Sequence, residues 1–360
     1  MKYSIIVPVF NRPDEVDELL ESLTRQTCRD FEVVIVEDGS EVRCEEVVRR
    51  YADQLDIHYF EKPNSGPGQS RNYGAERSQG EFLIVLDSDV VLPEGYLAEV
   101  DKELEANPCD AFGGPDRAHE SFTPVQKAIN YSMTSFFTTG GIRGGKKKLD
   151  KFYPRSFNMG IRRTLYQQLG GFSNMRFGED IDFSIRIFKS GSRCRLFPEA
   201  WVWHKRRTDF RKFFRQVHNS GIARINLYKK YPKSLKLVHL LPTVFTVGVI
   251  GCMLLFLLGI AMFCYGEWLD ANGLRPTDNM HQGVGFVFCV LALLPILLYC
   301  LLIFIDSSIC NRSLWVGILS IPASFIQLLG YGTGFLRAWW LRCVCGRNEE
   351  LQAFRKNFYK

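Results

Sequence analysis

The sequence lacks the motifs of several common nucleotide-binding and metal-binding sites. It has no G-x-G-x-x-G segment after its first predicted strand and no G-x-x-x-x-G-K-[ST] segment, which counts against dinucleotide enzymes and P-loop enzymes. Its 11 cysteines form neither C-x-x-C pairs nor zinc-binding spacings. We therefore expect reduced cysteines with mostly structural roles.

The N-terminus also lacks the features of a signal peptide. The apolar run that ends at Pro8 is too short, and no small-residue cleavage site follows it. We therefore expect the polar front of the chain to lie in the cytosol.

Charge is missing from three stretches near the C-terminus, at 237–266, 279–305 and 313–336. Each is longer than the roughly 20 residues that cross a bilayer as a helix. The hydrophobic content of 46% is thus an average over a polar front and an apolar tail, which excludes a wholly soluble protein. We expect membrane spans at about 237–265 and 284–305, and a third apolar segment at about 314–336 that spans the membrane or is re-entrant.

The charges that are present are segregated along the chain. Residues 1–188 contain 23 Lys and Arg against 31 Asp and Glu, a net charge of −8, whereas residues 189–236 contain 14 against 2, a net charge of +12. The basic segment directly precedes the first apolar stretch, and this position favours anionic membrane lipid over nucleic acid as its partner. We therefore expect no nucleic-acid binding.

The basic residues also predict a topology. The basic segment keeps the side before the first span cytosolic, and the following loop at 267–278 holds one basic residue, Arg275, as expected for an outer face. A third crossing would place the basic tail outside, against the positive-inside rule. Pro322 and the glycine-rich run at 330–334 weaken a straight span. We therefore expect the third segment to be re-entrant or interfacial and the tail to be cytosolic.

Strands and helices alternate through the polar front. Apolar runs at 3–9, 31–36 and 81–86 predict buried strands, and helices are predicted between them, the first of which opens at Pro13. This alternation predicts an α/β fold with a doubly wound, mostly parallel sheet. The expected organisation is a domain at 1–205, a basic helical collar at 206–236, a membrane region at 237–340 and a basic tail at 341–360.

Polar side chains follow three of the predicted strands where each strand ends. Asn11 follows the first strand, Asp38 the second, and Asp87 and Asp89 follow the strand at 81–86. Ligands of such sheets bind beyond the carboxyl ends of the strands, so these groups should share one edge. Two aspartates one residue apart repel each other unless a cation lies between them, and their oxygens suit Mg²⁺ or Mn²⁺. An isolated pair would more often be a simple turn, but the strand context favours a metal site.

Together these segments resemble the family 2 glycosyltransferases, which are inverting enzymes with nucleotide-sugar donors and the GT-A fold. The resemblance covers roughly residues 3–205 and implies a GT-A type, mixed and mostly parallel sheet, followed by an α-helical membrane region. Glu37 departs from the family, which more often has Asp there. The segments that carry the resemblance are Ile5 to Asn11, Val36 to Ser40, Gly66 through Asp89, and Gly178 to Asp182.

The resemblance implies a donor side formed by the strand ends. Pro8, Val9 and Asn11 would line the nucleotide pocket, and the carboxylate of Asp38 would accept a hydrogen bond from the base. Arg71 would lie near the donor nucleotide, although a helix residue of this kind is as readily a plain exposed charge.

The resemblance also implies a divalent metal, Mg²⁺ or Mn²⁺, that neutralises the departing nucleoside diphosphate. Asp89 would ligate the metal, and Asp87 would approach the ribose or the metal. His204 matches a late histidine that can complete the metal site, although a lone histidine after an aromatic strand is more often a packing residue.

The acidic segment at 178–182 precedes a predicted helix, where carboxylates can simply cap the helix. By resemblance, Asp180 is the general base that deprotonates the acceptor hydroxyl, and Glu179 is a catalytic residue that positions the acceptor. Asp182 and Asn158 would lie on the acceptor side. The glycine-rich and basic stretch at 140–148 would form a solvated loop or a lid over the donor.

These expectations combine into a membrane-anchored glycosyltransferase. It would transfer a single sugar, with inversion, from a UDP- or GDP-sugar to a lipid-linked acceptor or cell-envelope glycan. The segment at 214–219 lacks the Q-x-x-R-W sequence of processive synthases. The expected location is a bacterial-type inner membrane, crossed more than once, with the catalytic domain in the cytoplasm. Two alternatives stay open, a polyprenyl-phosphate sugar synthase of the same fold and a catalytically silent membrane adaptor.

Overall fold

The structure is a computed structural model in which the chain divides into two compact units. The first unit comprises the described residues of Met1–Phe122 and Lys146–Arg206, and the second comprises those of Thr123–Gly145 and Arg207–Leu351. The structure describes residues 1–117, 119, 121–140, 153–175, 177–273 and 280–350.

The first unit is built on a seven-stranded sheet in the order β3-β2-β1-β4-β8-β6-β9. Strand β8 is antiparallel to its neighbours β4 and β6, and the other neighbouring strands are parallel. This mixed, mostly parallel sheet confirms the predicted fold class. The strands are β1 (Tyr3–Val9), β2 (Phe31–Asp38), β3 (Ile57–Lys62), β4 (Phe82–Leu86), β6 (Ala111–Gly113), β8 (Asn158–Arg162) and β9 (Cys194–Leu196).

Helices cover both faces of this sheet. Side chains of α1, α2 and α4 pack on one face, and side chains of α3, α7 and α8 pack on the other. Helix α1 begins at Pro13, where a missing N–H costs nothing, and Val16, Leu19, Leu20 and Leu23 form its buried face. The helices are α1 (Pro13–Thr24), α2 (Glu45–Tyr51), α3 (Pro67–Arg77), α4 (Tyr96–Ala106), α7 (Arg163–Gln168) and α8 (Glu179–Lys189).

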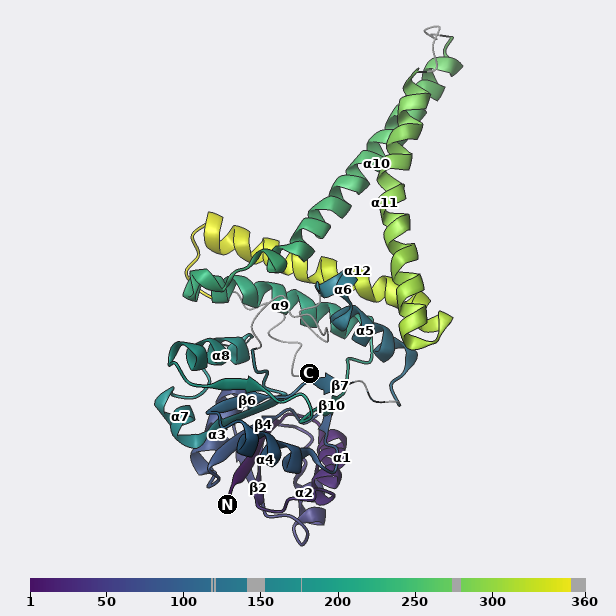
Figure 1. Cartoon of the computed structure of the whole chain (residues 1–360). Helices are drawn as coiled ribbons and strands as arrows, with labels where there is room; N and C mark the ends of the chain where they lie inside the picture. The colour runs from purple at the N-terminus through teal and green to yellow at the C-terminus, as the bar shows by residue number, and fades with distance from the viewer. Residues whose placement is uncertain (118, 120, 141–152, 176, 274–279, 351–360) are drawn as a thin grey trace. The chain divides into compact units, whose positions relative to one another are not determined.

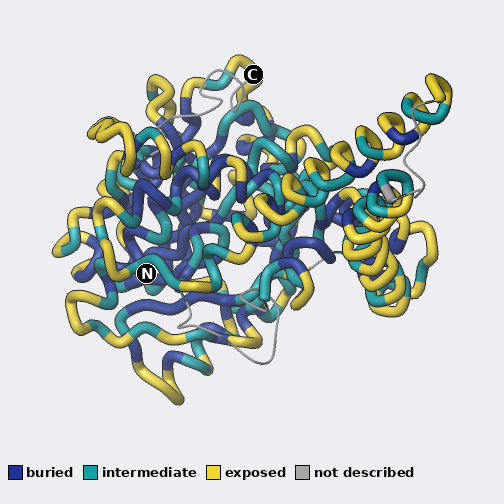
Figure 2. Tube along the Cα trace, turned by 90° about the horizontal axis from the view of Figure 1, so that it is seen from above, coloured by how far each residue is buried: buried dark blue, intermediate teal, exposed yellow. Residues whose placement is uncertain are grey.

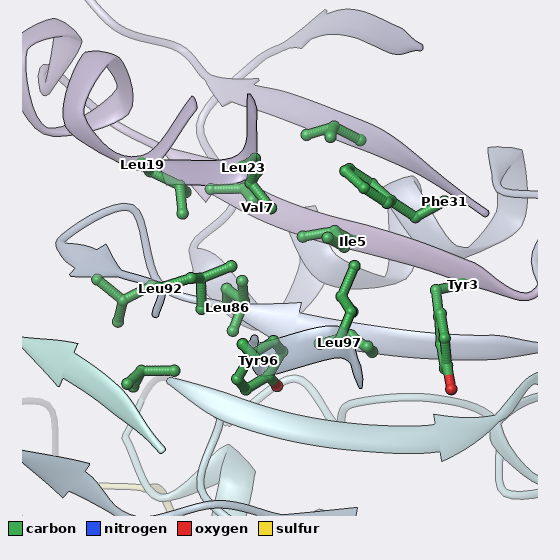
Figure 3. Close-up of a cluster of buried hydrophobic side chains, with 14 of the residues drawn as sticks. Tyr3, Ile5, Val7, Leu19, Leu23, Phe31, Leu86, Leu92, Tyr96 and Leu97 are labelled. Atoms are coloured by element: carbon green, nitrogen blue, oxygen red, sulfur yellow. The ribbon is translucent and has the colours of Figure 1, made fainter. Parts of the chain in front are cut away.

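Alternate side chains of β1 point to opposite faces of the sheet and join different hydrophobic clusters. Tyr3, Ile5 and Val7 are fully buried in the cluster that contains Leu19 of α1, as Figure 3 shows, whereas Ile6 belongs to the cluster on the α3 side. Full burial of such a side chain contributes about 1.5–3 kcal/mol. Figure 2, in which buried residues are dark blue, shows long buried stretches of the chain. The buried side chains on both faces of β1 hold this strand in place.

A second, three-stranded sheet in the order β5-β10-β7 completes the first unit. Strand β10 is antiparallel to β5, and in this register His204 lies opposite Val90, the residue after Asp89. Strand β10 is parallel to β7, which begins at Asp116. The strands are β5 (Val90–Val91), β7 (Asp116–Arg117) and β10 (Val202–His204).

The second unit is helical in its described residues. Helices α10 and α11 form a long hairpin, while α9 and α12 lie alongside each other (Figure 1). Three stretches are long and apolar enough to cross a membrane, namely Leu237–Ala271, His281–Asn311 and Leu314–Val344. The elements are α5 (Pro124–Thr134), α6 (Phe136–Thr139), α9 (Phe210–Lys230), η1 (Pro232–Ser234), η2 (Leu237–Leu240), α10 (Leu241–Ala271), α11 (Met280–Asn311), α12 (Leu314–Trp339) and η3 (Trp340–Val344).

Helix α12 is continuous through Pro322 and the glycine run at 330–334, which were expected to weaken a straight span. The glycines serve packing instead. A Cβ atom at Gly334 would lie 2.1 Å from the backbone oxygen of His218 in α9, and one at Gly332 would lie 2.0 Å from the hydroxyl of Thr246 in α10. Because glycine has no side chain, the backbone of α12 can approach α9 and α10 closely.

Candidate functional site

The carboxyl ends of the parallel strands carry the predicted donor-side residues. Pro8 and Val9 end β1, and Asp38 ends β2. Asp87 follows the last residue of β4 directly. The parallel pairing of β1 with β2 and β4 brings these residues to one edge of the sheet.

Asp38 is buried and fixes the loop that leads into α3. Its Oδ1 accepts hydrogen bonds from Lys62 Nζ at 2.5 Å and from the Ser65 amide at 2.9 Å, and its Oδ2 accepts from the Gly66 amide at 2.9 Å. A carboxylate can accept about four hydrogen bonds, so Asp38 retains capacity for one more donor. Its expected bond to a nucleotide base is compatible with this count.

Asn11 joins the ends of β1 and β2. Its backbone is left-handed, with φ of 54°, a conformation that asparagine tolerates better than most residues. Its side-chain oxygen accepts from the amides of Glu41 and Val42 at 2.8 and 2.9 Å, and its own amide donates to the Ser40 hydroxyl at 2.8 Å. Asn11 thus shapes the loop beside the expected nucleotide pocket.

Glu37 points away from this edge into a buried polar cluster. It accepts hydrogen bonds from Ser40, from the amide of Cys44 at 2.9 Å and from the Tyr59 hydroxyl at 3.2 Å. These partners account for the Glu residue where the resemblance led us to expect Asp.

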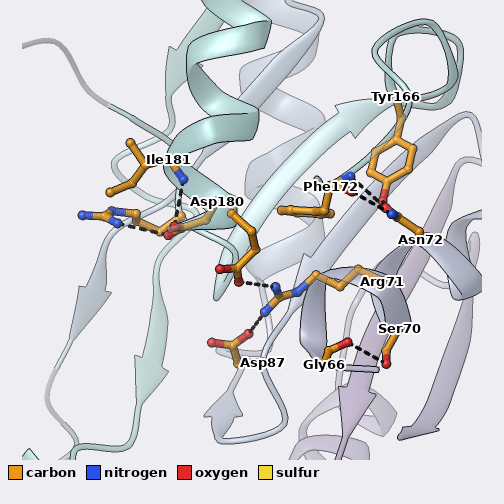
Figure 4. Close-up of polar contacts among 11 residues, drawn as sticks. Gly66, Ser70, Arg71, Asn72, Asp87, Tyr166, Phe172, Asp180 and Ile181 are labelled. Atoms are coloured by element: carbon orange, nitrogen blue, oxygen red, sulfur yellow. Dashed lines mark hydrogen bonds and ion pairs between the residues drawn. The ribbon is translucent and has the colours of Figure 1, made fainter. Parts of the chain in front are cut away.

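Arg71 is buried and connects two carboxylates of the site. Its guanidinium donates to Asp87 Oδ1 at 2.7 Å and to Glu179 Oε1 at 3.0 Å (Figure 4). Neighbouring Asn72 ties α3 to the chain before α8, since it bonds both the amide and the carbonyl of Phe172 at 2.8 Å. Arg71 is therefore part of a rigid network and is not the plain exposed charge that the sequence left open.

Glu179 and Asp180 begin α8, and a left-handed glycine sets their direction. Gly178 has a φ of 81°, which L side chains rarely adopt. Asp180 Oδ2 accepts from Arg155 at 3.1 Å, and its Oδ1 accepts from the amide of Ile181 at 2.8 Å. Both carboxylates therefore leave the helix N-terminus toward arginines.

The neighbouring charges separate the pKa values of these two acids. Burial and the adjacent Asp180 raise the pKa of Glu179, although Arg71 opposes the shift. Burial alone would raise the pKa of Asp180 too, but Arg155 outweighs it and holds that pKa below its ordinary range. Asp180 is accordingly the ionised member of the pair at neutral pH.

Asp87, Asp89 and His204 offer a set of metal ligands. One ligand atom of each lies within 4.8 Å of the others, and His204 Nε2 is 3.2 Å from Asp89 Oδ1. Two carboxylate oxygens and one imidazole nitrogen suit Mn²⁺, and also Mg²⁺ with further ligands from water or phosphate. His204 Nδ1 is buried without a hydrogen bond and lies 3.8 Å from Asp116 Oδ2. The residues fit the expected metal.

The surroundings of His204 increase its basicity. Burial alone would lower its pKa, but the carboxylates of Asp89 and Asp116 raise it to about 9. The ring stacks on Phe157, with centroids 4.8 Å apart, and Asp116 is itself paired with Arg206 at 2.5 Å. The imidazole is thus held by packing and by charge.

The predicted acceptor-side residues Asn158 and Asp182 lie in the interior of the first unit. Asn158 is fully buried, where it accepts from the Tyr96 hydroxyl at 2.6 Å and donates to the Ala200 oxygen at 2.8 Å. Asp182 is also fully buried and pairs with Arg186 at 2.9 Å. Both side chains stabilise the core. The stretch at 140–148, expected to be a loop or a lid, lies outside the described residues except for Gly140.

Sequence reasoning missed the arginines that hold the carboxylates. Arg155 pairs with Asp180, Arg206 pairs with Asp116, and an Arg12 nitrogen lies 3.8 Å from Asp89 Oδ2. Arg155 stands in a segment where the family resemblance fades. A usable signal existed for Arg12 and Arg206, because each lies within two residues of a predicted site residue.

Comparison with known proteins finds similarity to glycosyltransferases. Residues 4–170 match the model of glycosyl transferase family 2. The chain is 33% identical over 196 residues to an uncharacterized glycosyltransferase of Haemophilus influenzae (strain ATCC 51907 / DSM 11121 / KW20 / Rd), which covers 52% of this chain and 63% of that protein. It is 25% identical over 324 residues to YdaM, a probable glycosyltransferase of Bacillus subtilis (strain 168), which covers 86% of this chain and 74% of that protein.

A solved structure shares the fold. It is the mannosyltransferase PcManGT from Pyrobaculum calidifontis in complex with GDP-Man and Mn²⁺, with a TM-score of 0.51 and 18% identity over 80% of this chain and 87% of that chain. The chain spans less than two thirds of the length of the Haemophilus relative. Residues 4–170 are thus similar to glycosyl transferase family 2, and the relatives that match the chain are glycosyltransferases.

Proposed function

We propose that the protein is a glycosyltransferase that moves a single sugar, with inversion, from a nucleotide-sugar donor to an acceptor at a membrane. The observation that carries this proposal is the bridge from Asp87 through Arg71 to Glu179, the neighbour of Asp180. It joins the expected donor end of the site to the expected base in one network. In an inverting transfer the acceptor attacks the carbon on the face opposite the leaving group, so the base and the diphosphate must lie on opposite sides of that carbon.

The strand-end residues would bind the donor. Asp87, Asp89 and His204 would hold a divalent metal, which supplies positive charge for the departing diphosphate. PcManGT, which shares the fold, carries GDP-Man and Mn²⁺ in its structure, and this supports a nucleotide sugar with a divalent ion. UDP- and GDP-sugars remain equal candidates for the donor.

Asp180 would act as the general base. Its lowered pKa keeps the carboxylate ionised at neutral pH, and a base must be ionised to accept the proton of an acceptor hydroxyl. Arg155 fixes the orientation of one oxygen. Glu179, held by Arg71, would position the neighbouring groups rather than take the proton.

The membrane helices support an acceptor at the bilayer surface, such as a lipid-linked glycan. We propose that α10 and α11 cross the membrane and that α12 lies in the interface. The Ser320 hydroxyl of α12 contacts that of Ser307, near the end of α11, at 2.6 Å, and the α12 backbone approaches Thr246, near the start of α10. Helix α12 therefore lies across the two hairpin ends that the charge pattern assigns to the cytosol.

Helix α9 supports the same placement. A Cβ atom at Gly330 of α12 would lie 2.5 Å from Val217 of α9, and Arg342 beyond α12 donates to Asn226 Oδ1 at 2.7 Å. The basic helix α9 therefore accompanies the C-terminal half of α12. A membrane-spanning α12 would draw the charges of α9 toward the bilayer, at about 2.5–3.5 kcal/mol for each at the centre. An interfacial pair leaves them near anionic headgroups.

Thiol labelling tests this topology with cysteines that the chain already has. Cys310 precedes α12, Cys345 follows it, and both are exposed. Two variants would each keep one of them, with the other exposed cysteines changed to serine. We expect an impermeant maleimide to label both variants in inverted vesicles and neither in right-side-out vesicles. Labelling of the two cysteines from opposite sides would show that α12 spans the membrane.

The catalytic proposal is tested with membranes that contain the protein, labelled nucleotide sugars and lipid extract. We expect one of the UDP- or GDP-sugars to give a labelled lipid-soluble or glycan product in the presence of Mn²⁺ or Mg²⁺. A product with one added sugar supports single transfer, and long polymer contradicts it. Calorimetry with UDP or GDP and Mn²⁺ distinguishes the transferase from the catalytically silent adaptor. The adaptor would show no metal-dependent nucleotide binding.

A further inference from the structure

We propose that Glu32, Asp56 and His58 form a second divalent cation site, suited to Zn²⁺, at the amino end of the sheet. The three residues come from β2, from the residue before β3 and from β3. One ligand atom of each lies within 4.8 Å of the others. Asp87 and Asp89 follow β4 and His204 ends β10, whereas these three residues lie where β2 and β3 begin, so the two clusters are separate sites.

The strand register brings these side chains to one face. Ser4 of β1 is paired with Glu32 of β2, and the pairing of Val33 with Ile57 places Asp56 beside Glu32. Side chains alternate along a strand, so His58 projects to the same side as Asp56. Strand β3 is at the edge of the sheet, and His58 and Asp56 are 38% and 49% exposed. A solvated ion can therefore reach the cluster.

Glu32 is the unusual member because its carboxylate is fully buried. Its Oε1 accepts from the Ser4 hydroxyl at 2.6 Å and from the Gln79 amide, whereas its Oε2 receives no hydrogen bond. A buried carboxylate oxygen without a donor is costly. That oxygen is aimed at His58, with Nε2 3.2 Å away. The two donors on Oε1 fix the carboxylate in the way that outer partners orient metal ligands.

Two of the three spacings between the ligand atoms match those around a tetrahedral ion. His58 Nε2 lies 3.2 Å from Glu32 Oε2 and 3.3 Å from Asp56 Oδ1. Ligand atoms around a tetrahedral zinc with bonds of about 2.0–2.1 Å are about 3.3–3.4 Å apart. One ring N–H cannot point at two oxygens, so a hydrogen bond from His58 can satisfy only one of them. An ion between the three atoms satisfies all of them at once.

The choice of Zn²⁺ rests on the short spacing and not on the donor types alone, which equal those of Asp87, Asp89 and His204. One imidazole nitrogen and two carboxylate oxygens would leave a fourth tetrahedral position for water, as in zinc sites with three protein ligands. Three protein ligands on β2, β3 and the chain before β3 would fix the edge strand to its neighbour. The expected role is stabilisation of the edge of the sheet.

Zinc titration of the metal-free full chain in detergent tests the proposal, with Zn²⁺ alone as the probe. We expect two zinc-binding events, one lost in His58→Gln and the other in Asp89→Asn. Zinc should also raise the thermal unfolding midpoint of Asp89→Asn by several degrees, and this rise should vanish when His58→Gln is added. His58 is partly exposed, so its replacement should leave the fold intact, which circular dichroism checks.

A second variant guards against indirect effects. Asp56→Asn keeps the shape of the side chain and should weaken zinc binding in the Asp89→Asn background by about tenfold or more. Arg77, on the surface of α3, provides the control, since Arg77→Gln should leave zinc binding unchanged. Equal zinc affinity and an equal unfolding shift with and without His58→Gln would overturn the proposal. Zinc binding that is lost entirely in Asp89→Asn and is unchanged by His58→Gln would overturn the proposal as well.

Discussion

At the scale of single residues, three carboxylates of the site are held by arginines. Asp87 and Glu179 share Arg71, and Asp180 has Arg155. The guanidinium fork suits this task because it directs several fixed N–H groups at two acceptors at once. The arginines keep like charges close together before any ligand binds, so the site is preorganised.

The general base is the sharpest prediction at this scale. In Asp180→Asn the side chain keeps its shape but cannot accept a proton, so we expect kcat to fall by about 10²–10⁴-fold with little change in the donor KM. Initial rates at varied donor concentration measure this. Asp53→Asn, an exposed position on the first unit, is the control and should keep full activity. Unchanged turnover in Asp180→Asn would remove Asp180 from the base role.

The Arg71 bridge gives a second prediction. A lysine can pair with Asp87 or with Glu179 but cannot hold both in the same geometry, so Arg71→Lys should lower kcat/KM and the thermal unfolding midpoint together. Arg77→Lys on the same helix, where the side chain is exposed, is the matched control. If Arg71→Lys retained both the activity and the midpoint of the unchanged protein, the bridge would have no structural or catalytic importance.

At the scale of elements, close helix packing explains the glycines at 330–334. Glycine has a low helix propensity, yet α12 is continuous through this run, and its glycines face α9 and α10. Periodicity and propensity describe one element at a time. The partner that makes a glycine favourable is a tertiary fact that the local sequence does not contain.

Alanine at Gly334 tests this packing. Its Cβ would lie 2.1 Å from a backbone oxygen of α9, so the helices must separate, and we expect a loss of about 1–3 kcal/mol. Gly251→Ala in α10 has nothing within 4 Å of the new Cβ and should be neutral or slightly stabilising. Thermal unfolding in detergent compares the two variants. Equal midpoints would show that α12 does not pack on α9 in this way.

The link between α4 and β1 predicts a pH dependence of stability. Asp101 accepts hydrogen bonds from Lys2 and Tyr3. Burial alone would raise the pKa of Asp101, but these partners hold it below its ordinary value of 3.8. A lowered folded-state pKa gives stability that is complete above the unfolded-state value and is lost as the pH falls through the folded-state value.

Asp101→Asn should therefore cost about 1–3 kcal/mol at pH 7. The difference from the unchanged protein should shrink steadily below pH 3.8, because the carboxyl group of the unchanged protein then becomes protonated too. Urea unfolding at several pH values, followed by tryptophan fluorescence, measures it. A difference that stays constant down to the most acidic pH would contradict the assignment.

At the scale of the whole molecule, the sequence predicted the architecture well because its signals are local. The strand that ends at Leu86 and the acids that follow it are visible as one apolar run and one motif, and the same holds for the end of β2 at Asp38. The fold class is confirmed for these reasons. Three apolar helices are also present as predicted, although their relation to a membrane stays a prediction.

The features that could not be predicted from the sequence are side-chain contacts between segments that are far apart in the chain. Asn158 looked like an acceptor-side residue at a strand, but its hydrogen bonds to Tyr96 and Ala200 consume its polar groups inside the core. Arg155 showed no motif, yet it faces Asp180 across 25 residues of chain. The direction of a side chain depends on packing among elements that are far apart in sequence.

The central claim is a sugar transfer that depends on the strand-end acids and on Asp180. Its most direct measurement uses membranes that contain the unchanged protein, Asp89→Asn or Asp180→Asn, each given labelled UDP- and GDP-sugars with Mn²⁺. The account predicts a labelled product with one added sugar from the unchanged protein and a loss of at least about 100-fold in both variants. Equal product from all three proteins, or no product from any donor with the unchanged protein, would contradict it.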